Sequence, residues 1–379
     1  MDGEFDMHTL KCGFLGLGLI GGSIAKALKQ SNGFRAFHTV FDPNLDSLEL
    51  AQKDGVADAV VTSLDTDAIV AFSDCDYLFL CAPVQCNIEN LQKIREVLSP
   101  KCIITDVGSV KTGIHDAIDS LGLSHQFIGG HPMAGSERMG YLNSKALLLE
   151  NAYYILTPTI AVSSDKISAF QNLVKAMGAI PLVLSHGNHD YATAAISHLP
   201  HIVAAALVNL VKDSDSKDGL MKMIAAGGFK DITRIASSSP EMWQQICLSN
   251  TSNIASLLGE YIHALDQIYE LLLTNDASKL YEFFDSARTY RESFVGSGSG
   301  PIKTEYTLNI DISDEPGALA SIATMLAVRD ISIKNIGITH NRELEEGALR
   351  IEFYSPEDVT NAKTLLESKG YTVYAKKDL

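Results

Sequence analysis

The segment Gly13-Phe14-Leu15-Gly16-Leu17-Gly18-Leu19-Ile20-Gly21-Gly22 decides the fold of the first part of the chain. It ends an apolar run and opens a helical pattern that extends to Lys29. Gly16 permits a tight turn, Gly18 lets the backbone approach a pyrophosphate, and Gly21 allows the helix to pack closely. The positive end of the helix dipole favours the bound anion. The segment therefore predicts the strand, turn and helix of a dinucleotide-binding domain.

An acidic residue ends the next predicted strand. Asp42 lies at a distance from Gly21 at which a carboxylate can accept hydrogen bonds from an adenosine ribose. Because this carboxylate would repel a 2'-phosphate, we expect the cofactor NAD rather than NADP. The alternative is that Asp42 only caps the helix that starts after Pro43.

Short apolar runs alternate with helical stretches from residue 10 to residue 164. This alternation favours a parallel, doubly wound sheet of the Rossmann type, and we expect the NAD-binding domain to occupy 10–164. The predicted strands are Lys11 to Leu15, Phe37 to Phe41, Asp76 to Cys81, Cys102 to Asp106, Gln126 to Gly129 and Tyr153 to Thr157.

From residue 165 to residue 295 apolar residues recur at helical spacing, apart from one strand-like run at Ile180 to Leu184. We therefore expect an all-helical domain that binds substrate. Its helices are so rich in Ala, Leu and Ile that a second copy of the chain is expected to cover part of them, which predicts a homodimer.

The last part of the chain follows a linker. Residues 296–303 are rich in glycine and serine and predict a flexible connection. Residues 304–379 then predict strand, helix, two strands, helix and strand, a βαββαβ order that is ferredoxin-like.

Composition limits the possible partners. The 379 residues are 46% apolar and 20% charged, as in globular proteins of two or three domains. The formal charge of -16 argues against nucleic acid and anionic membrane surfaces as partners. The six cysteines form no C-x-x-C pair, and residues 1–9 resemble no secretory signal. A cytoplasmic protein follows, in which residues 1–7 are either native or an added leader.

The segment Ile128-Gly129-Gly130-His131-Pro132-Met133-Ala134-Gly135-Ser136-Glu137 places one imidazole among glycines that allow close backbone approach. This pattern is typical of an active-site loop. A histidine that titrates near its usual pKa, about 6.5, could accept a hydroxyl proton at neutral pH. The alternative is a core or capping histidine.

A second polar segment, Asp106-Val107-Gly108-Ser109-Val110-Lys111, follows a predicted strand. Ser109 and Lys111 therefore lie at the carboxyl end of the sheet, where open α/β sheets bind ligands. Both could instead cap the helix that follows.

The helical domain contains two further polar segments, Ser197-His198-Leu199-Pro200-His201 and Gly227-Gly228-Phe229-Lys230-Asp231-Ile232-Thr233-Arg234. The first places two histidines on one helix face, but no third ligand of suitable spacing accompanies them or the pair His186 and His189, so we expect no metal. The second leads to an arginine that could bind a carboxylate with two hydrogen bonds or form an ordinary surface salt bridge.

Together, these motifs resemble the prephenate dehydrogenase family with an appended ACT domain, and the resemblance covers nearly the whole chain. It rests on the glycine segment at Gly16, on the segments that contain Ser109 and His131, and on the two segments of the helical domain. The resemblance implies NAD-dependent oxidative decarboxylation of prephenate to 4-hydroxyphenylpyruvate in tyrosine biosynthesis.

The resemblance also implies roles for individual residues. His131 would accept the proton of the 4-hydroxyl while hydride leaves the same carbon, and Ser109 would orient that hydroxyl. Arg234 would hold the ring carboxylate, with Lys111 as the next candidate. The pyruvyl side chain would meet His201 and Ser197, and Gly227 and Gly228 would complete the pocket from the partner subunit. The supporting residues would be His198, Asp231, Trp243 and Glu137, with Asp231 as a partner of a histidine. The expected cofactor-binding residues are Gly16, Gly18, Leu19, Ile20, Gly21, Asp42, Ala82 and Pro83.

The resemblance identifies the last domain as an amino-acid-binding ACT module with tyrosine as the expected effector. Its ligand turn would consist of Asp314, Pro316, Gly317, Ala318 and Leu319, with Asn335 on the next strand. The alternative is a module kept only for dimerisation.

Three alternative functions remain. The substrate could be arogenate, which has an amino group where prephenate has its keto oxygen, although His201 favours a keto acid. A β-hydroxyacid dehydrogenase would use a lysine on the helical domain, but Lys230 lacks the expected setting. A non-catalytic amino-acid sensor is disfavoured by the intact set of His131, Ser109 and Arg234.

Overall fold

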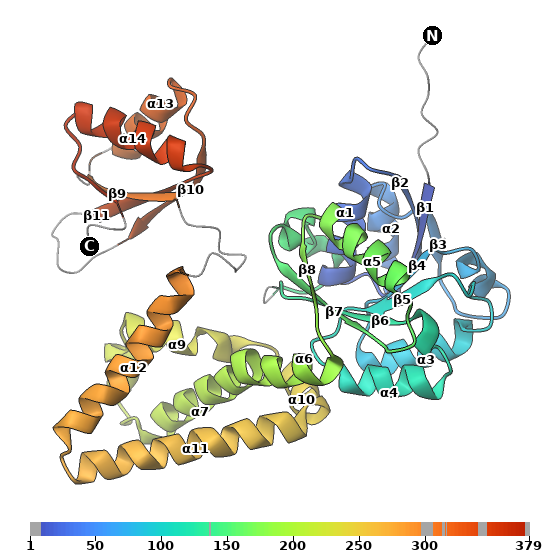
Figure 1. Ribbon diagram of the computed structural model, residues 1–379, viewed down its shortest axis with the longest axis horizontal. Coiled ribbons are helices and arrows are strands. Elements are labelled where there is room, and N and C mark those ends of the chain that lie inside the picture. Colours follow the sequence, from blue (N-terminus) through green and yellow to red (C-terminus); the bar gives the residue numbers. More distant parts are fainter. Residues whose placement is uncertain are drawn as a thin grey trace. The chain divides into compact units, whose positions relative to one another are not determined.

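The computed structural model describes residues 9–135, 138–296, 306–312, 315, 317–339 and 347–375. The chain divides into two compact units, Met1–Ala277 and Ser278–Leu379, and each is described by itself (Figure 1). The first unit contains β1 (Thr9–Leu15), α1 (Leu19–Gln30), β2 (Arg35–Phe41), α2 (Leu45–Lys53), β3 (Ala59–Val61), η1 (Ala68–Phe72), β4 (Tyr77–Leu80), α3 (Val84–Ile94), β5 (Ile103–Asp106), α4 (Thr112–Ser120), η2 (Ser124–Gln126), β6 (Ile128–Pro132), η3 (Tyr141–Asn143), η4 (Ala146–Leu149), β7 (Tyr153–Pro158), α5 (Ser164–Ala176), β8 (Ile180–Val183), α6 (His186–Thr193), η5 (Ala194–His198), α7 (Leu199–Ser214), α8 (Leu220–Ile224), α9 (Gly227–Thr233), η6 (Arg234–Ser237), α10 (Pro240–Ser249) and α11 (Thr251–Leu273).

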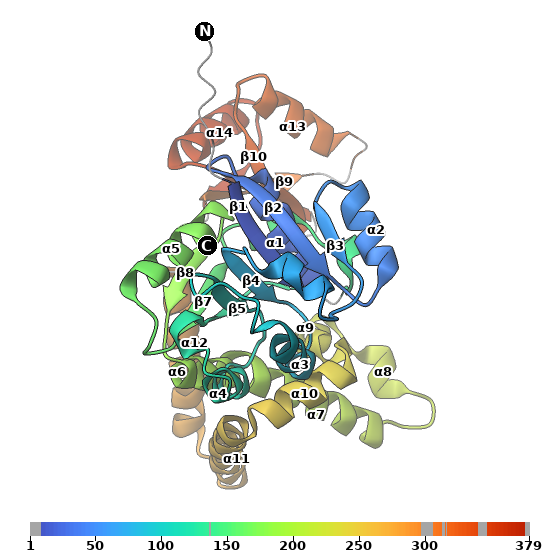
Figure 2. The same ribbon diagram turned by 90° about the vertical axis from the view of Figure 1, so that its right-hand side faces the viewer.

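Five parallel strands form the main sheet in the order β3-β2-β1-β4-β5. Figure 2 shows β1, β2 and β3 side by side. The chain moves outward from β1 to β3 and then returns to the other side of β1 with β4, so the strand order reverses between β1 and β4. The carboxyl ends of the strands at such a reversal are where these sheets bind ligands. The predicted Rossmann-type sheet is confirmed, and the short strand β3 is one that the sequence analysis missed.

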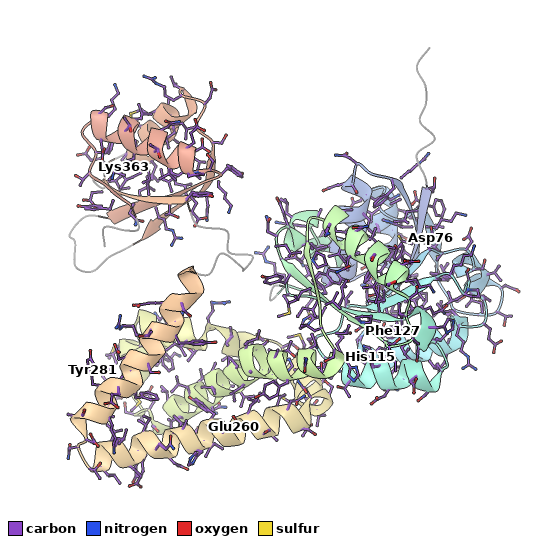
Figure 3. All side chains as sticks on the ribbon, in the orientation of Figure 1. Asp76, His115, Phe127, Glu260, Tyr281 and Lys363 are labelled. Carbon is purple, nitrogen blue, oxygen red and sulfur yellow. The ribbon has the colours of Figure 1, made fainter. Side chains whose placement is uncertain are left out.

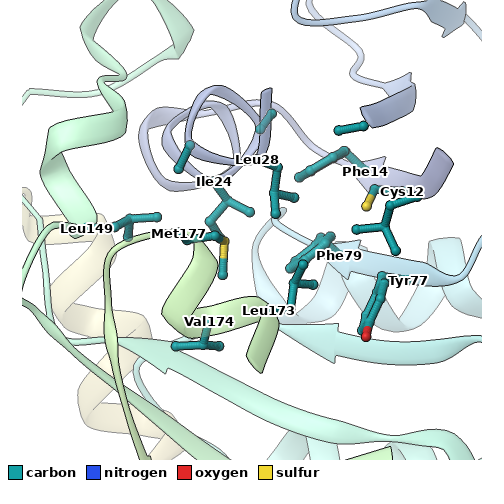
Figure 4. Packing of buried hydrophobic residues seen from close by; sticks show 14 of the residues in the cluster. Cys12, Phe14, Ile24, Leu28, Tyr77, Phe79, Leu149, Leu173, Val174 and Met177 are labelled. Carbon is teal, nitrogen blue, oxygen red and sulfur yellow. The ribbon is translucent and has the colours of Figure 1, made fainter. Parts of the chain in front are cut away.

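The main sheet is covered on both faces. In β4 all four residues are buried, and they alternate between two apolar clusters. Tyr77 and Phe79 pack in the cluster that contains side chains of α1, α2 and α5, shown in Figure 4. Leu78 and Leu80 pack in the cluster that contains side chains of α3 and α4. A continuous apolar run in a central parallel strand is therefore explained by burial on both sides.

A second, smaller sheet has the order β6-β7-β8 and carries the glycine-rich histidine segment. β6 is antiparallel to β7, and a parallel bridge between Ile104 and Phe127 links it to β5. The expectation of an entirely parallel arrangement is wrong here, because the chain returns from β6 to β7 through a connection that contains no long helix.

Helix α5 and strand β8 belong with these sheets, although the sequence analysis placed residues 165–184 with the helical segment. β8 pairs in parallel with β7, and Phe170, Leu173 and Val174 of α5 are buried against the sheet residues. We propose that the boundary between the first two domains lies after β8.

The remaining helices of the first unit begin with a continuous helical stretch, His186–Ser214, which by length and composition is apolar enough to cross a membrane, with a mean hydropathy of 1.6. The stretch contains the buried polar residues His189, Asp190 and His198. It includes a π-helical turn, Ala194–His198, a deviation that is frequent at functional sites.

The second unit comprises α12 (Ala277–Gly296) and a small domain. The small domain contains β9 (Tyr306–Ile312), α13 (Ala318–Ala327), β10 (Ile333–Thr339), β11 (Gly347–Phe353), α14 (Pro356–Ser368) and β12 (Val373–Ala375). Its antiparallel sheet has the order β10-β11-β9-β12, and the apolar sides of both helices join one core with the sheet. The predicted βαββαβ fold, the arrangement of an ACT domain, is confirmed. Of the predicted linker, residues 297–303 lie outside the described residues.

Candidate active site

His131 lies in β6 beside the carboxyl end of β5, because the two preceding glycines let β6 pack tightly against its neighbours. A Cβ atom on Gly130 would lie 2.5 Å from the backbone oxygen of Asp106 and 2.9 Å from the Thr105 hydroxyl. A Cβ atom on Gly129 would collide with the Thr157 hydroxyl. The glycines therefore set the position of the histidine that follows them.

A chain of hydrogen bonds runs from His131 to a buried carboxylate. The Nδ1 atom of His131 lies 2.8 Å from Nε2 of His189, and Nδ1 of His189 lies 2.7 Å from the Asp190 carboxylate. An ionised carboxylate only accepts hydrogen bonds, so His189 must carry its proton on Nδ1. Neutral His189 then accepts at Nε2, and His131 must donate from Nδ1. The unprotonated nitrogen of neutral His131 is therefore Nε2.

The Asp190 carboxylate is ionised and fixed by several donors. It accepts the backbone N–H of Lys111 at 2.8 Å, and the backbone N–H and hydroxyl of Thr112 at 2.8 and 2.6 Å. Burial opposes ionisation of Asp190, but the hydrogen bonds from His189, Thr112 and Lys111 outweigh it and lower the pKa of Asp190 to about 2. The carboxylate can thus set the tautomers of both histidines at neutral pH.

Burial lowers the pKa of His131 well below its usual value, and the positive charge of Lys111 lowers it further. The neighbouring histidines His189 and His198 act in the same direction, while Asp190 opposes them. The expectation of a histidine that titrates at its usual pKa is therefore wrong for the protein without substrate. The lowered pKa favours the neutral form of His131.

Lys111 lies beneath the site rather than in it. Its side chain is fully buried, forms an ion pair with Asp106 and donates to the Gly130 carbonyl oxygen at 2.7 Å. The expected role of Lys111 in binding substrate does not fit this placement, because the ammonium is enclosed by groups of the protein. Ser109 is half-buried on the same β5–α4 turn, between Asp106 and Lys111.

A second group of the expected residues gathers on α7 and α10. The rings of His201 and Trp243 are stacked, with centroids 3.7 Å apart, and the ring of His198 meets Trp243 edge-on at 6.0 Å. Nδ1 of His201 donates to the Ser197 carbonyl oxygen at 2.8 Å. Burial lowers the pKa of His201, and the charge of Arg234 lowers it further, against the effect of the Ser197 hydrogen bond. His198, which also acts on His131, connects this group to the first.

An apolar pocket of about 520 Å³ lies beside the second group. Its lining includes His201, Ile235, Trp243 and Cys247. The indole N–H of Trp243 has no hydrogen-bond partner among the described residues. The exposed Arg234 begins the turn η6, whose next residue, Ile235, lines the pocket.

The positions of four other expected residues say less about the site. Gly227 and Gly228 begin α9, where a Cβ on either would meet open space. Asp231 is exposed on the same helix, and within the described ranges the carboxylate that holds a histidine is Asp190 instead. Glu137 lies outside the described residues.

His189, Asp190 and Asn250 are site residues that the sequence analysis missed. Asn250 donates to the Asp190 carbonyl oxygen at 2.8 Å and lies 3.3 Å from Nδ1 of His198. The pair His186 and His189 was considered only as a metal site. The sequence offered one signal for this site, because Asp190 directly follows His189. It offered no signal that His131 is the partner of His189.

His186 instead stacks on His115 of α4, with ring centroids 4.6 Å apart. His115 also meets Phe127 edge-on at 5.1 Å, and Figure 3 labels both residues. These contacts hold the start of α6 against the nucleotide-binding part.

The glycine turn suits a dinucleotide. Gly16 has a φ of 96°, and its hypothetical Cβ would lie 2.8 Å from the Ala82 nitrogen. Gly18 precedes α1, a Cβ there would meet nothing within 4 Å, and no side chain at the N-cap and no acidic residue in the first turn compete for the helix amides. The amide groups at Leu19 and Ile20 thus remain suitable for an anion. Gly21 is packed against Cys81, which confirms the close approach expected at that position.

Asp42 stabilises this turn directly. Its carboxylate accepts the backbone N–H of Leu17 at 2.6 Å and that of Asn44 at 2.8 Å. The side chain that caps α2 belongs to Asn44, so Asp42 is not the helix cap. Ala82 and Pro83 lie on the facing β4–α3 turn, which Asn87 fixes by accepting from the Ala82 N–H and donating to its carbonyl oxygen.

In the small domain Gly317 has a φ of 92°, a left-handed conformation that favours glycine, and it precedes Ala318 and Leu319 at the start of α13. A hollow of about 400 Å³ is lined by Leu319, Ile336 and residues near them. Asn335 is exposed on β10. Asp314 and Pro316 lie outside the described residues.

The chain is similar to known proteins over most of its length. Residues 24–182 match the family model of the prephenate dehydrogenase nucleotide-binding domain, and residues 185–286 match that of the prephenate dehydrogenase dimerization domain. A prephenate dehydrogenase of Bacillus subtilis is 38% identical, over 94% of this chain and 95% of its own.

Two solved structures resemble the first part of the chain. One is the prephenate dehydrogenase of A. aeolicus in complex with hydroxyphenyl propionate and NAD⁺, with a TM-score of 0.71, 31% identity and coverage of 76% of this chain and 99% of that one. The other is the Synechocystis arogenate dehydrogenase, with a TM-score of 0.68, 30% identity and coverage of 76% and 100%. With its dinucleotide turn, its buried histidine relay and both family models in place, the chain belongs to the prephenate dehydrogenase family.

Proposed function

We propose that this protein converts prephenate and NAD to 4-hydroxyphenylpyruvate, carbon dioxide and NADH as a soluble, cytoplasmic enzyme. The observation that carries the proposal is the relay from His131 through His189 to Asp190, which leaves Nε2 of His131 as a hydrogen-bond acceptor. Membership of the prephenate dehydrogenase family supports the substrate.

The first step removes a hydride from the carbon that carries the hydroxyl and a proton from the hydroxyl oxygen. The amides at the start of α1 would hold NAD at the glycine turn, and the bound cofactor would supply the hydride acceptor for the carbon that carries the substrate hydroxyl. His131 takes the hydroxyl proton at Nε2, so a neutral alcohol does not have to lose hydride while it keeps its proton. The imidazolium that forms donates from Nδ1 to His189, and His189 donates to Asp190. The buried carboxylate thereby stabilises a positive charge that exists only after proton transfer.

The second step is the loss of the ring carboxylate. The bond between the ring and this carboxylate breaks, carbon dioxide leaves, and the electron pair enters the ring to give an aromatic phenolate. The phenolate oxygen can take the proton back from Nε2 of His131, which restores the neutral histidine. Ser109, on the turn next to Gly130, is placed to orient the hydroxyl.

We assign Arg234 to the ring carboxylate, because its guanidinium lies near His201 at the turn beside the apolar pocket. A planar guanidinium can form two parallel hydrogen bonds with a carboxylate, which fixes orientation as well as charge. In the family, Gly227 and Gly228 contribute from the partner subunit, and we assign them the same role here.

A homodimer fits the surface of the helical part. Many large apolar side chains on α7 to α11 are exposed in the single chain, among them Leu210, Met223, Ile224, Leu248 and Leu265. Large exposed apolar side chains gathered on one part of a chain favour an interface there. The match of residues 185–286 to a dimerization domain supports the same proposal.

Arogenate is the second candidate substrate, and the tautomer of His201 favours it. Since Nδ1 of His201 donates to a carbonyl oxygen, neutral His201 can only accept at Nε2. An acceptor suits the ammonium group of arogenate, whereas the keto oxygen of prephenate would need a protonated His201. The similarity to the Synechocystis arogenate dehydrogenase, which covers 76% of this chain, supports the same candidate.

The first prediction separates these substrates. Although the tautomer of His201 suits arogenate, the relative that matches almost the whole chain is a prephenate dehydrogenase. With NAD, we therefore expect NADH formation with kcat/KM for prephenate at least about tenfold above that for arogenate. Initial rates of absorbance at 340 nm, with NADP as a control cofactor, measure this. A preference for arogenate would replace prephenate as the substrate, and no turnover of either would reject the proposed reaction.

For His131→Asn we expect kcat to fall by about 10²-fold or more, because the base acts on the developing transition state. NAD affinity, measured by calorimetry, should stay unchanged. His125→Asn is the matched control, since His125 is an exposed histidine on η2. A kcat of His131→Asn near that of the wild type would remove this residue from the chemistry.

For Arg234→Gln we expect KM for prephenate to rise by about 30-fold or more, while kcat changes far less. A carboxylate bound in both the ground state and the transition state contributes uniform binding, and loss of a charged bidentate pair costs on the order of 2 kcal/mol or more. Arg35→Gln, at an exposed arginine of β2, is the control. If KM stays within twofold of the wild type, another group holds the ring carboxylate.

We also propose that tyrosine inhibits the enzyme through the small domain, where the left-handed Gly317 and exposed Asn335 flank the start of α13 and the strand β10. For Asn335→Ala we expect about tenfold weaker inhibition by tyrosine, a coupling loss of about 1.4 kcal/mol, with unchanged kcat. Lys334→Ala, at the neighbouring exposed residue, is the control. Undiminished inhibition that is competitive with prephenate would place tyrosine in the active site.

A further inference from the structure

The buried ion pair between Lys111 and Asp106 has no part in the reaction described above. Both side chains are at most 1% exposed. Removing two charges from water is costly, and such pairs often contribute nothing to stability. A buried pair that directly adjoins the candidate base therefore calls for a role other than holding the fold together.

The pair holds both backbone polar groups of Gly130, the residue that precedes His131. The Lys111 ammonium donates to the Gly130 carbonyl oxygen at 2.7 Å, and the Asp106 carboxylate accepts the Gly130 N–H at 3.2 Å. The same carboxylate accepts the Gly108 N–H at 2.9 Å, on the turn that carries Ser109. One ion pair thus fixes the backbone on both sides of the place where the substrate hydroxyl is expected.

Lys111 also acts on the imidazole ring through its other end. Its backbone N–H donates to Asp190 at 2.8 Å, and Asp190 orients His189, which orients His131. The main chain before His131 and the ring of His131 are therefore both positioned by one residue of the β5–α4 turn.

We propose that Lys111, paired with Asp106, is a positioning residue that holds His131 in place and keeps its ring neutral before substrate binds. This inference rests on the proposed role of His131 as the base and deepens it. Of the groups that act on His131, Lys111 is at the start of α4, His189 and Asp190 are on α6, and His198 is on η5. The ammonium has a second consequence: it disfavours a second positive charge beside it. Burial lowers the pKa of His131 first, and the charge of Lys111 is the next largest cause.

The sign of the effect follows directly. If Lys111 disfavours the imidazolium, its removal must raise the pKa of His131, and the acid limb of the kcat/KM profile must move to higher pH. If Lys111 only supported the fold, its substitution would lower activity at every pH and would leave the acid limb of the kcat/KM profile at the same pH. The pH profile therefore separates the two roles.

The first test uses the full-length protein without substrate, so it does not depend on the proposed reaction. Histidine is labelled with ¹³C at Cε1, the His131 signal is assigned by its loss in His131→Asn, and its shift is followed against pH. We expect a midpoint below 6.5 in the wild type. A midpoint at or above 6.5 would overturn the proposal whether or not the Lys111 variants fold.

The second test compares Lys111→Met with the double variant Asp106→Asn/Lys111→Met, which leaves no unpaired buried charge. We expect the His131 midpoint and the acid limb to rise by about one pH unit or more in both variants, the lower end of the range for one nearby charge. We also expect kcat on the pH plateau to fall about tenfold or more, because the Gly130 carbonyl is no longer held. Lys29→Met, which breaks the 2.6 Å pair of Lys29 with Asp58 away from this network, is the matched control and should move neither. Lower activity with an unmoved midpoint would overturn the proposal, as would unchanged activity.

Discussion

The constraint on which the site depends is the carboxylate of Asp190, which caps a helix of a different part of the fold. Helix α4 begins at Thr112 and has no capping side chain of its own. Asp190 on α6 accepts the backbone N–H groups of Lys111 and Thr112 instead, and so satisfies donors that every helix start leaves open. The same carboxylate orients His189. Docking of α6 against the nucleotide-binding part and alignment of the candidate base are therefore one interaction.

Much of the fold and part of the site could be predicted because local patterns encode them. The glycine segment at Gly16 specifies a strand, a turn and a helix through backbone geometry alone, and the structure has that arrangement. Apolar runs buried on both faces identified the central strands. The same reasoning could not find β3, which has only three residues, or the antiparallel pairing of β6 with β7, since strand direction depends on how the connection runs.

The sequence could not predict where the side chains of the site point. His189 and His131 lie 58 residues apart, so their hydrogen bond has no local signature. Lys111 stands where a ligand-binding lysine would stand, yet its ammonium turns inward to Asp106 and Gly130. A sequence gives the residue type and the end of the strand. Whether a long charged side chain points to solvent or into the protein depends on whether a buried group of opposite charge is within its reach.

The low basicity of His131 raises the question of how it can accept a proton at all. A base with a depressed pKa is weak in the free protein, but the substrate hydroxyl becomes far more acidic as hydride leaves its carbon. The imidazolium is then needed only in the transition state, where His189 and Asp190 receive its charge through a preformed relay. In the ground state a neutral ring forms no ion pair with the carboxylates of the substrate, so they remain available to cations such as Arg234. A neutral His131 in the ground state therefore leaves the substrate carboxylates to the cations that orient them. It also means that the relay stabilises a charge that forms only in the transition state.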